Sequence, residues 1–160
     1  MERKIAAFDV DGTLYRSNLL VDLVYQLVRQ GSFPDRIIEE FTDAQLSWKQ
    51  ERHRESYVQY MDVLINTYVK NLKGLPIEEL NTAARQVIRH SPGLVYVFGK
   101  NLIQNLQPTH HLVAISGSPI EVVAPFVNQL GIQDVHATTF ETENNTYTGE
   151  VVHIGTRRKD

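Results

Sequence analysis

Hydrophobic and polar residues divide the chain into two regions with different periodicities. In the first region, residues 5–8 form a short apolar run typical of a buried strand. Residues 18–29 then repeat apolar side chains at the spacing of a helix, which Gly31 would end. A longer and more polar helical region is predicted over 34–72, and a further helix over 77–89. We therefore expect one strand followed by a mostly helical segment.

The second region, from residue 94 onward, alternates between helical and strand patterns. The expected elements are a helix over 94–106, a strand over 111–115, a helix over 119–130, a strand over 134–138 and a hairpin across 138–152. This β-α-β order predicts an α/β fold with a Rossmann-like parallel sheet and right-handed crossovers. Because ligands of such sheets bind beyond the carboxyl ends of the strands, function is expected where the strands at 5–8 and 111–115 end.

Composition narrows the class of protein without naming it. With 160 residues, 42% of them hydrophobic and 22% charged, the chain can bury one core and a small appendage. A net charge of -3 lacks the basic footprint of a protein that binds nucleic acid or an anionic membrane. The absence of cysteine excludes disulfides and thiolate metal sites, and the six histidines lack paired metal-ligand spacing. No signal-peptide pattern or apolar stretch of ~18 residues occurs, so we expect a cytoplasmic protein.

Two carboxylates follow the first strand. Asp9 and Asp11 lie two residues apart and are expected to point the same way, while Gly12 and Thr13 let the backbone turn close to an anion. One carboxylate can attack phosphorus while the other moves the proton, provided that a hard cation neutralises the negative charge. The alternative is an aspartate-rich turn that caps the strand. That alternative explains one aspartate and Gly12, but not the apolar strand that leads into both carboxylates.

A hydroxyl group and a glycine follow the second strand. Ser116 can hydrogen-bond a phosphate oxygen, and Gly117 allows its backbone N–H to approach an anion. Ser118 is expected to cap the next helix and Pro119 to occupy its first position, which would direct a helix N-terminus at the phosphate. Taken alone, these residues also fit a strand-turn-helix connection that binds no ligand.

The two motifs resemble those of the haloacid dehalogenase superfamily of phosphohydrolases, in which D-x-D-x-T and a small hydroxyl residue each follow a buried strand. The resemblance covers residues 5–155 and is similar to the phosphoserine-phosphatase-like branch, whose members carry a helical cap after the first motif and a hairpin before the third. It implies a core built from residues 1–14 and 91–160, with an inserted all-helical cap of residues 15–90.

Residues beside the cap hinge would select the substrate. Tyr15 and Arg16 could touch the leaving group at the entrance, or they could be ordinary hinge residues. Asn18 stands where phosphoserine phosphatases usually carry a glutamate that helps to hold the substrate's amino group. An uncharged amide cannot pair with an ammonium group, so we do not expect phosphoserine to be favoured. The apolar stripe that includes Tyr57 and Tyr60 is interpreted as cap core rather than as a substrate box.

The end of the family pattern is incomplete in this sequence. Lys159 lies near the expected place of the third-motif lysine, which balances the charge of the aspartyl phosphate, but it also fits a solvated basic tail. No acidic fourth motif of the G-D-x-x-x-D type, which completes the magnesium site, occurs in the 160 residues. We expect a chain cut short before that motif or a naturally incomplete relative. In the family's sheet order the missing strands lie beyond the strand at 5–9, so truncation would expose an apolar edge beside Asp9 that favours self-association.

The resemblance implies a Mg²⁺-dependent phosphomonoester hydrolase that acts on a small phosphorylated metabolite. Asp9 would attack phosphorus and would hold Mg²⁺ together with the backbone carbonyl of Asp11, whose side chain would act as general acid and base. Thr13, Ser116 and the Gly117 N–H would bind the phosphoryl oxygens. Dehalogenation is disfavoured because that chemistry does not need the second carboxylate. The alternative is a non-catalytic binding or interaction module that keeps the fold but lacks the metal site.

Overall fold

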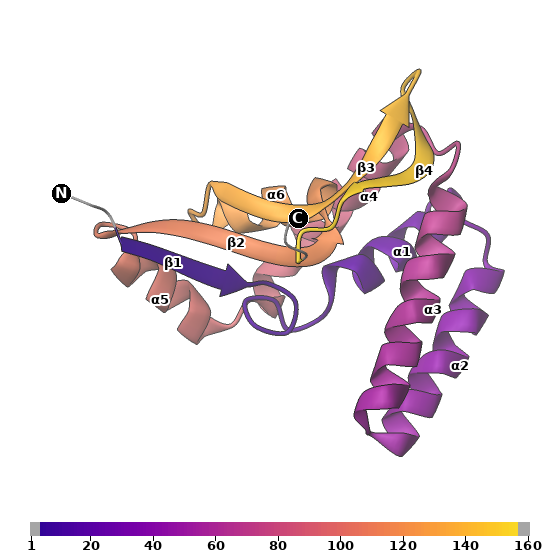
Figure 1. Cartoon of the computed structure of the whole chain (residues 1–160), viewed down its shortest axis with the longest axis horizontal. Helices are drawn as coiled ribbons and strands as arrows, with labels where there is room; N and C mark the ends of the chain where they lie inside the picture. The colour runs from indigo at the N-terminus through magenta and orange to yellow at the C-terminus, as the bar shows by residue number, and fades with distance from the viewer. Residues whose placement is uncertain (1–3, 157–160) are drawn as a thin grey trace.

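The computed structural model describes residues 4–156 as one sheet with helices packed around it (Figure 1). Its elements, in chain order, are β1 (Lys4–Asp9), α1 (Leu19–Arg29), α2 (Arg36–Glu51), α3 (Arg54–Leu72), α4 (Ile77–His90), the 3₁₀ turn η1 (Ser91–Leu94), α5 (Val97–Leu106), β2 (His110–Pro119), α6 (Ile120–Gln129), β3 (Asp134–Glu143) and β4 (Thr146–His153). The order of strands and helices matches the expectation, and the main difference is that the helical region over 34–72 is divided in two.

The sheet has the order β1-β2-β3-β4, with β1, β2 and β3 parallel and β4 antiparallel to β3. This confirms the predicted α/β fold with a parallel core. The turn between β3 and β4 is formed by Asn144 and Asn145, which adopt positive φ angles of 49° and 64°. Two consecutive residues in the left-handed region form the type of turn that matches the twist of a hairpin.

Helices cover the sheet and also extend from it. Helix α6 packs on β2 and β3, α5 packs on β2, and α1 and α4 pack against each other and against α6. The pair α2 and α3 instead extends away from the sheet as a helical hairpin (Figure 1). The division into a core and a cap of residues 15–90 stays a prediction, although α1 and α4 lie within the packed layer and only α2 and α3 project.

The break between α2 and α3 was not predicted from the sequence. Arg52 adopts a left-handed conformation with φ of 50°, and its N–H still donates to the carbonyl of Trp48. His53 then begins α3, because its Nδ1 accepts a hydrogen bond from the backbone N–H of Ser56 at 3.2 Å. Neither arginine nor histidine is a typical turn former, so periodicity alone gave no sign of this reversal.

The β3–β4 hairpin is tied to the loop between α3 and α4. The backbone N–H of Gly74 donates to the carbonyl of Tyr147 at 2.8 Å, and the N–H of Tyr147 donates to Leu75 at 3.0 Å. A third bond runs from the N–H of Ile77 to Asn145 at 3.0 Å. The hairpin therefore fixes the base of the α2–α3 extension relative to the sheet.

Strand β1 forms one edge of the sheet among the residues that the structure describes. Ile5 on this strand is 71% exposed, which is unusual for a β-branched apolar side chain in a parallel sheet. This exposed edge is the feature from which self-association was expected, and self-association stays a prediction. None of the helices within residues 4–156 combines the length and the apolar character needed to cross a membrane.

Candidate active site

A tight loop after β1 places two aspartates at the carboxyl end of the sheet. Asp9 is the last residue of β1 and pairs in register with Ile115 of β2. Val10 turns inward and is fully buried, and its carbonyl accepts a hydrogen bond from the N–H of Leu14 at 2.9 Å. The turn requires Gly12, whose φ of +78° is disfavoured for residues with a side chain. The loop therefore presents both carboxylates at the same edge, as the motif predicts.

The carboxylate of Asp11 is enclosed and hydrogen-bonded on both oxygens. Oδ1 accepts from the backbone N–H of Leu19 at 2.7 Å, and Oδ2 accepts from the hydroxyls of Ser116 at 2.8 Å and Ser118 at 2.9 Å. Burial raises the pKa of Asp11 above its ordinary value, and the nearby charge of Asp9 acts in the same direction, while the three hydrogen bonds oppose this shift. A carboxyl group that keeps its proton to higher pH is suited to donate that proton.

Asp9 has the opposite environment. Its side chain is exposed, and its Oδ2 accepts a hydrogen bond from the hydroxyl of Thr13 at 2.6 Å. Thr13 was expected to hold a phosphoryl oxygen, and its hydroxyl lies directly beside the carboxylate that would attack the phosphorus. The exposed member of the pair is therefore accessible to a substrate, whereas the enclosed member is held in a fixed orientation.

The second motif lies next to the first, but Ser118 has a different role from the one expected. Strand β2 continues to Pro119, which is the N-cap residue of α6, so Ser118 does not cap that helix. Ser118 donates instead from its hydroxyl to Asp11, and its N–H donates to the Oγ of Ser116 at 2.9 Å. Gly117 is exposed, and its carbonyl accepts from the hydroxyl of Thr138 at 2.7 Å. The structure thus brings Ser116, Gly117 and the two aspartates together.

Ser118 is the partner of Asp11 that sequence reasoning missed. The signal was present, because residues two apart on a strand point to the same face. Had the strand been extended past 115, Ser116 and Ser118 would both have been directed at the first motif. The assignment of Ser118 to a helix cap came from ending the strand too early.

A pocket of about 270 Å³ opens directly in front of Asp11. One wall comes from the loop after β1 and the start of α1, and the other wall comes from α2 and α3. The residues that line it are Asp11, Gly12, Arg16, Ser17, Asn18, Val21, Gln45, Trp48, Tyr57, Tyr60 and Met61. The pocket thus joins the sheet edge to the helical hairpin.

Two of the three expected entrance residues line this pocket. The guanidinium of Arg16 lies 5.3 Å from the centroid of the Tyr96 ring, a cation–π contact. Asn18 caps α1, because its Oδ1 accepts from the N–H of Val21 at 3.1 Å. Its side-chain oxygen is therefore engaged by the helix, while the amide NH₂ can donate to a ligand.

Tyr15 does not lie at the entrance. It is 1% exposed, and its ring packs edge-on against Phe126 at 5.1 Å between centroids. Its hydroxyl donates to Asp22 at 2.6 Å. Burial and the Asp22 carboxylate raise the pKa of the Tyr15 hydroxyl. The aromatic ring turns into the apolar core because that core is adjacent, so the expected contact with the leaving group does not occur in this structure.

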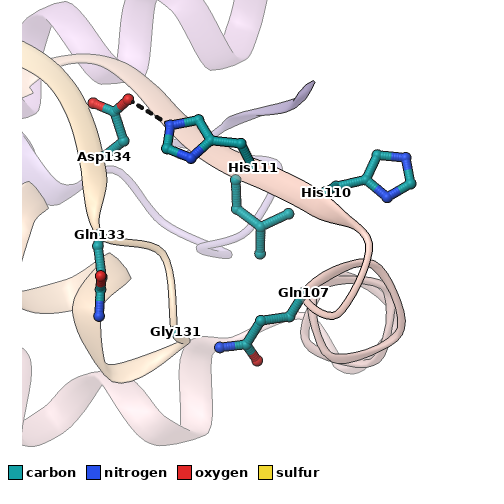
Figure 2. A pocket seen from close by; sticks show the side chains of 7 residues that line it. Gln107, His110, His111, Gly131, Gln133 and Asp134 are labelled. Carbon is teal, nitrogen blue, oxygen red and sulfur yellow. Dashed lines mark hydrogen bonds and ion pairs between the residues drawn. The ribbon is translucent and has the colours of Figure 1, made fainter. Parts of the chain in front are cut away.

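Another pocket, of about 240 Å³, lies at the opposite end of the sheet (Figure 2). It lies where β2 and β3 begin, and the Nε2 of His111 is 2.9 Å from the Oδ2 of Asp134 there. The labelled glutamines, Gln107 and Gln133, also line it (Figure 2). Because both motifs lie at the carboxyl ends of the strands, this polar pocket is remote from the carboxylate pair. Lys159, the candidate third-motif lysine, lies outside the described residues.

Comparison with known proteins agrees with this geometry. The family model of haloacid dehalogenase-like hydrolases matches residues 6–158. The chain belongs to this family. The match includes both aspartates of the first motif and the serines of the second. No curated protein matches the chain.

Solved structures share the fold of this family member. A protein of unknown function from Bordetella pertussis Tohama I is 18% identical with a TM-score of 0.72, over 94% of this chain and 67% of that protein. A phosphoserine phosphatase, solved as an analogue of its phospho-aspartyl intermediate, is 20% identical with a TM-score of 0.55, over 94% and 63%. Cytosolic 5′-nucleotidase IIIB, bound to cytidine, is 13% identical with a TM-score of 0.63, over 97% and 55%. The chain therefore spans about two thirds or less of these relatives.

The donor atoms at the sheet edge fit Mg²⁺ in kind. Magnesium prefers hard oxygen ligands in an octahedron, and the exposed carboxylate of Asp9 beside the backbone of Asp11 supplies such atoms. Within residues 4–156, however, no group of three or more acidic or histidine side chains is arranged so that it could hold a metal ion. The described residues therefore supply part of a magnesium site, and the remaining ligands would be water or further acidic groups.

Proposed function

We propose that this chain is a Mg²⁺-dependent phosphomonoester hydrolase that works through an aspartyl-phosphate intermediate. One observation carries the proposal: two aspartates at the same sheet edge have opposite environments, Asp9 exposed and Asp11 enclosed by three hydrogen bonds. Such a division suits a nucleophile and a proton carrier, as two carboxylates in different surroundings take different roles. The fold neighbours include phosphatases, which supports the same class of reaction.

In the first step, an oxygen of Asp9 forms a bond to phosphorus while the bond from phosphorus to the leaving oxygen breaks. The proton of the Asp11 carboxyl passes to that leaving oxygen, so that an alcohol departs. In the second step, water gives a proton to Asp11 and its oxygen forms a bond to phosphorus. The bond between phosphorus and the Asp9 oxygen breaks at the same time. Inorganic phosphate leaves, and both carboxyl groups return to their starting states.

Several groups would hold the phosphoryl oxygens. Thr13 and Ser116 are proposed as donors, although in this structure their hydroxyls donate to Asp9 and Asp11. Each hydroxyl would rotate toward the phosphoryl group as it binds, and the Gly117 N–H would add a third donor. Lys159 is proposed to balance the charge of the intermediate.

Magnesium would be held by the Asp9 carboxylate and the Asp11 backbone carbonyl, and when bound it would neutralise negative charge that otherwise repels the phosphoryl group. The substrate is proposed to be a small phosphorylated metabolite, and the setting is proposed to be cytoplasmic. Residues 15–90 are proposed to act as the cap over the site. A non-catalytic binding module is the other candidate, favoured because residues 4–156 contain no group of three acidic or histidine side chains that could hold a metal ion.

The decisive experiment is a test of the nucleophile. We expect Asp9→Asn to lower the turnover of p-nitrophenyl phosphate with Mg²⁺ by about a thousandfold or more, because the atom that forms the intermediate is lost. Acid-quenched protein should carry alkali-labile phosphate in the wild type and none in Asp9→Asn. Asp43→Asn, an exposed acid on α2, is the matched control and should behave like wild type. Wild-type turnover by Asp9→Asn would refute the mechanism, and no turnover by any form would favour the binding module.

A further inference from the structure

The two walls of the pocket in front of Asp11 differ in chemistry. The wall from the loop after β1 is polar and includes Asp11, Gly12 and Asn18. The opposite wall, from α2 and α3, includes Trp48 and Tyr57, which we call the aromatic wall. Asp11, which would give its proton to the leaving oxygen, lines this space, so the leaving group would extend from Asp11 between these two surfaces. The aromatic wall is therefore where the leaving group would be recognised.

The rings of the aromatic wall are supported from behind. Trp48 stacks on Tyr60 with 7° between their planes and 5.6 Å between ring centroids, and Tyr60 is buried. Tyr57 meets Trp48 at 60° and 5.3 Å, yet it remains 43% exposed. Tyr60 thus fixes Trp48 by stacking and, although buried, also lines the pocket, while Tyr57 keeps more exposed surface. The stripe is therefore not cap core alone, because Tyr57 and Tyr60 both line the pocket.

The charged residues of this pocket disfavour leaving groups that carry an ammonium group. Of the residues that line it, only Asp11 and Arg16 carry a charge. Asp11 accepts three hydrogen bonds within the protein, and Arg16 lies against the ring of Tyr96. No acidic side chain in the lining is thus left to pair with an ammonium group, which disfavours amino-acid phosphates such as phosphoserine. Aromatic surface in a pocket favours a flat apolar group instead.

We propose that the aromatic wall is the leaving-group subsite, and that the preferred substrates are phosphomonoesters whose leaving group carries a planar, uncharged aromatic or heteroaromatic ring. The proposal rests on the proposed phosphatase function. A volume of about 270 Å³ is at the low end of ligand pockets, which fits one ring system rather than an oligomer. The amides of Asn18 and Gln45 in the lining offer hydrogen bonds to polar atoms of a heteroaromatic ring.

Kinetics with matched substrates test the subsite. Benzyl phosphate and a nucleoside 5′-monophosphate carry a ring on an alcohol, whereas glycerol phosphate and phosphoserine carry none. In the full chain we expect kcat/KM for at least one of the two ring-bearing substrates to exceed that for the ringless ones by about tenfold to a hundredfold, the range that stacking on aromatic side chains supplies. Comparing the two ring-bearing substrates shows whether the subsite prefers a bare aromatic ring or a nucleoside base. Equal kcat/KM for all four substrates would overturn the proposal.

Variants separate recognition from folding. Trp48→Ala and Tyr57→Ala should raise KM for the ring-bearing substrate about tenfold and leave glycerol phosphate within about twofold, while Trp48→Phe and Tyr57→Phe should restore most of the loss. Leu46→Ala is the control, because Leu46 is an exposed apolar residue of α2 outside the lining. A uniform loss for every substrate, accompanied by a lower Tm, would mean that these rings only support the hairpin and would overturn the proposal.

Binding without turnover gives a second measurement. Trp48 is the only tryptophan of the chain, so intrinsic fluorescence reports on this pocket. In Asp9→Asn, at least one of benzyl phosphate and the nucleoside 5′-monophosphate should cause a saturable change in fluorescence that Tyr57→Ala weakens, and glycerol phosphate should cause none. A protein that hydrolyses phosphate esters but shows no such change would overturn the subsite alone. A saturable change without hydrolysis by the wild type would support the subsite and defeat the phosphatase function.

Discussion

Two regions face each other across one pocket: the carboxyl end of the sheet, which carries Asp11 and is called the edge below, and the aromatic wall. They are held together by different kinds of interaction. At the carboxyl end of the sheet, Asp11 is held by a backbone N–H and two hydroxyls at 2.7 to 2.9 Å, and the chain turns directly after it at Gly12, which has a positive φ. On the wall, Trp48 and Tyr57 are held by ring packing and keep exposed surface. Directional bonds fix the edge, whereas nondirectional packing shapes the wall.

This difference teaches where change is tolerated. A displaced carboxylate at the edge loses several hydrogen bonds at once, and a buried acid without partners is costly. A changed ring on the wall alters only surface and shape, so the leaving group can be exchanged while the phosphate chemistry is kept. We expect substitutions at the edge to change reaction rates for every substrate, and substitutions on the wall to change preference among substrates.

The largest effect within this comparison is expected from Asp11→Asn. An amide cannot take a proton from water, so hydrolysis of the intermediate should slow by about a hundredfold to ten-thousandfold. Formation of the intermediate from p-nitrophenyl phosphate should persist, because its leaving group needs little help from an acid. Rapid mixing should then show a burst of p-nitrophenol close to the enzyme concentration, followed by slow turnover. Steady turnover of Asp11→Asn at the wild-type rate would show that Asp11 does not transfer the proton.

A smaller effect is expected where the two regions meet, at Asn18. Asn18→Asp keeps the helix cap, because both residue types accept from the backbone of α1, and it adds a negative charge to the pocket lining. The ratio of kcat/KM for phosphoserine to that for glycerol phosphate should rise by up to about fivefold, which corresponds to one partly exposed ion pair. Asn18→Ala, which loses the cap, should not raise the ratio. An unchanged ratio in a stable Asn18→Asp protein would contradict this role.

The sequence predicts a region well when the interacting residues are close along the chain. The edge was predicted well, because apolar runs and D-x-D-G-T act over a few neighbouring residues, and the parallel register then brings Asp9 next to Ile115. One error there, the role of Ser118, came from ending β2 too early. The direction of Tyr15 was not predictable from local pattern, since it depends on Phe126, more than a hundred residues later.

The wall was predicted poorly for a related reason. Helical periodicity marks Tyr57 and Tyr60 as one apolar stripe, but it cannot show that the chain reverses at Arg52 and brings Trp48 beside them. Only that reversal brings Trp48, Tyr57 and Tyr60 together in the lining of the pocket that Asp11 also lines. A local pattern states which residues are apolar, whereas the tertiary contact decides which of them face a ligand.

The smallest effect concerns Glu121, which joins helix α6 to strand β4 of the β3–β4 hairpin. It lies in the first turn of α6, and its Oε1 accepts from the hydroxyl of Tyr147 at 2.9 Å, while within the described residues Oε2 is buried without a hydrogen-bond partner. Burial raises the pKa of Glu121, so the folded state favours the neutral form. The contribution to stability is therefore complete below the unfolded-state pKa and is lost as pH rises through the folded-state pKa.

Glu121→Gln keeps the acceptor for Tyr147 and removes this titration. The free energy of unfolding, measured in urea, should rise for the variant relative to wild type as pH increases from 4 to 8, because only wild type loses the contribution of the neutral carboxyl. If the new NH₂ group finds no partner, the variant would be less stable by about 1 to 3 kcal/mol at every pH. This constant loss would not change how the difference between variant and wild type varies with pH. Tyr147→Phe is the control for the hydrogen bond alone. A difference between variant and wild type that stays flat across this pH range would show that Glu121 titrates in the folded protein as it does in the unfolded chain.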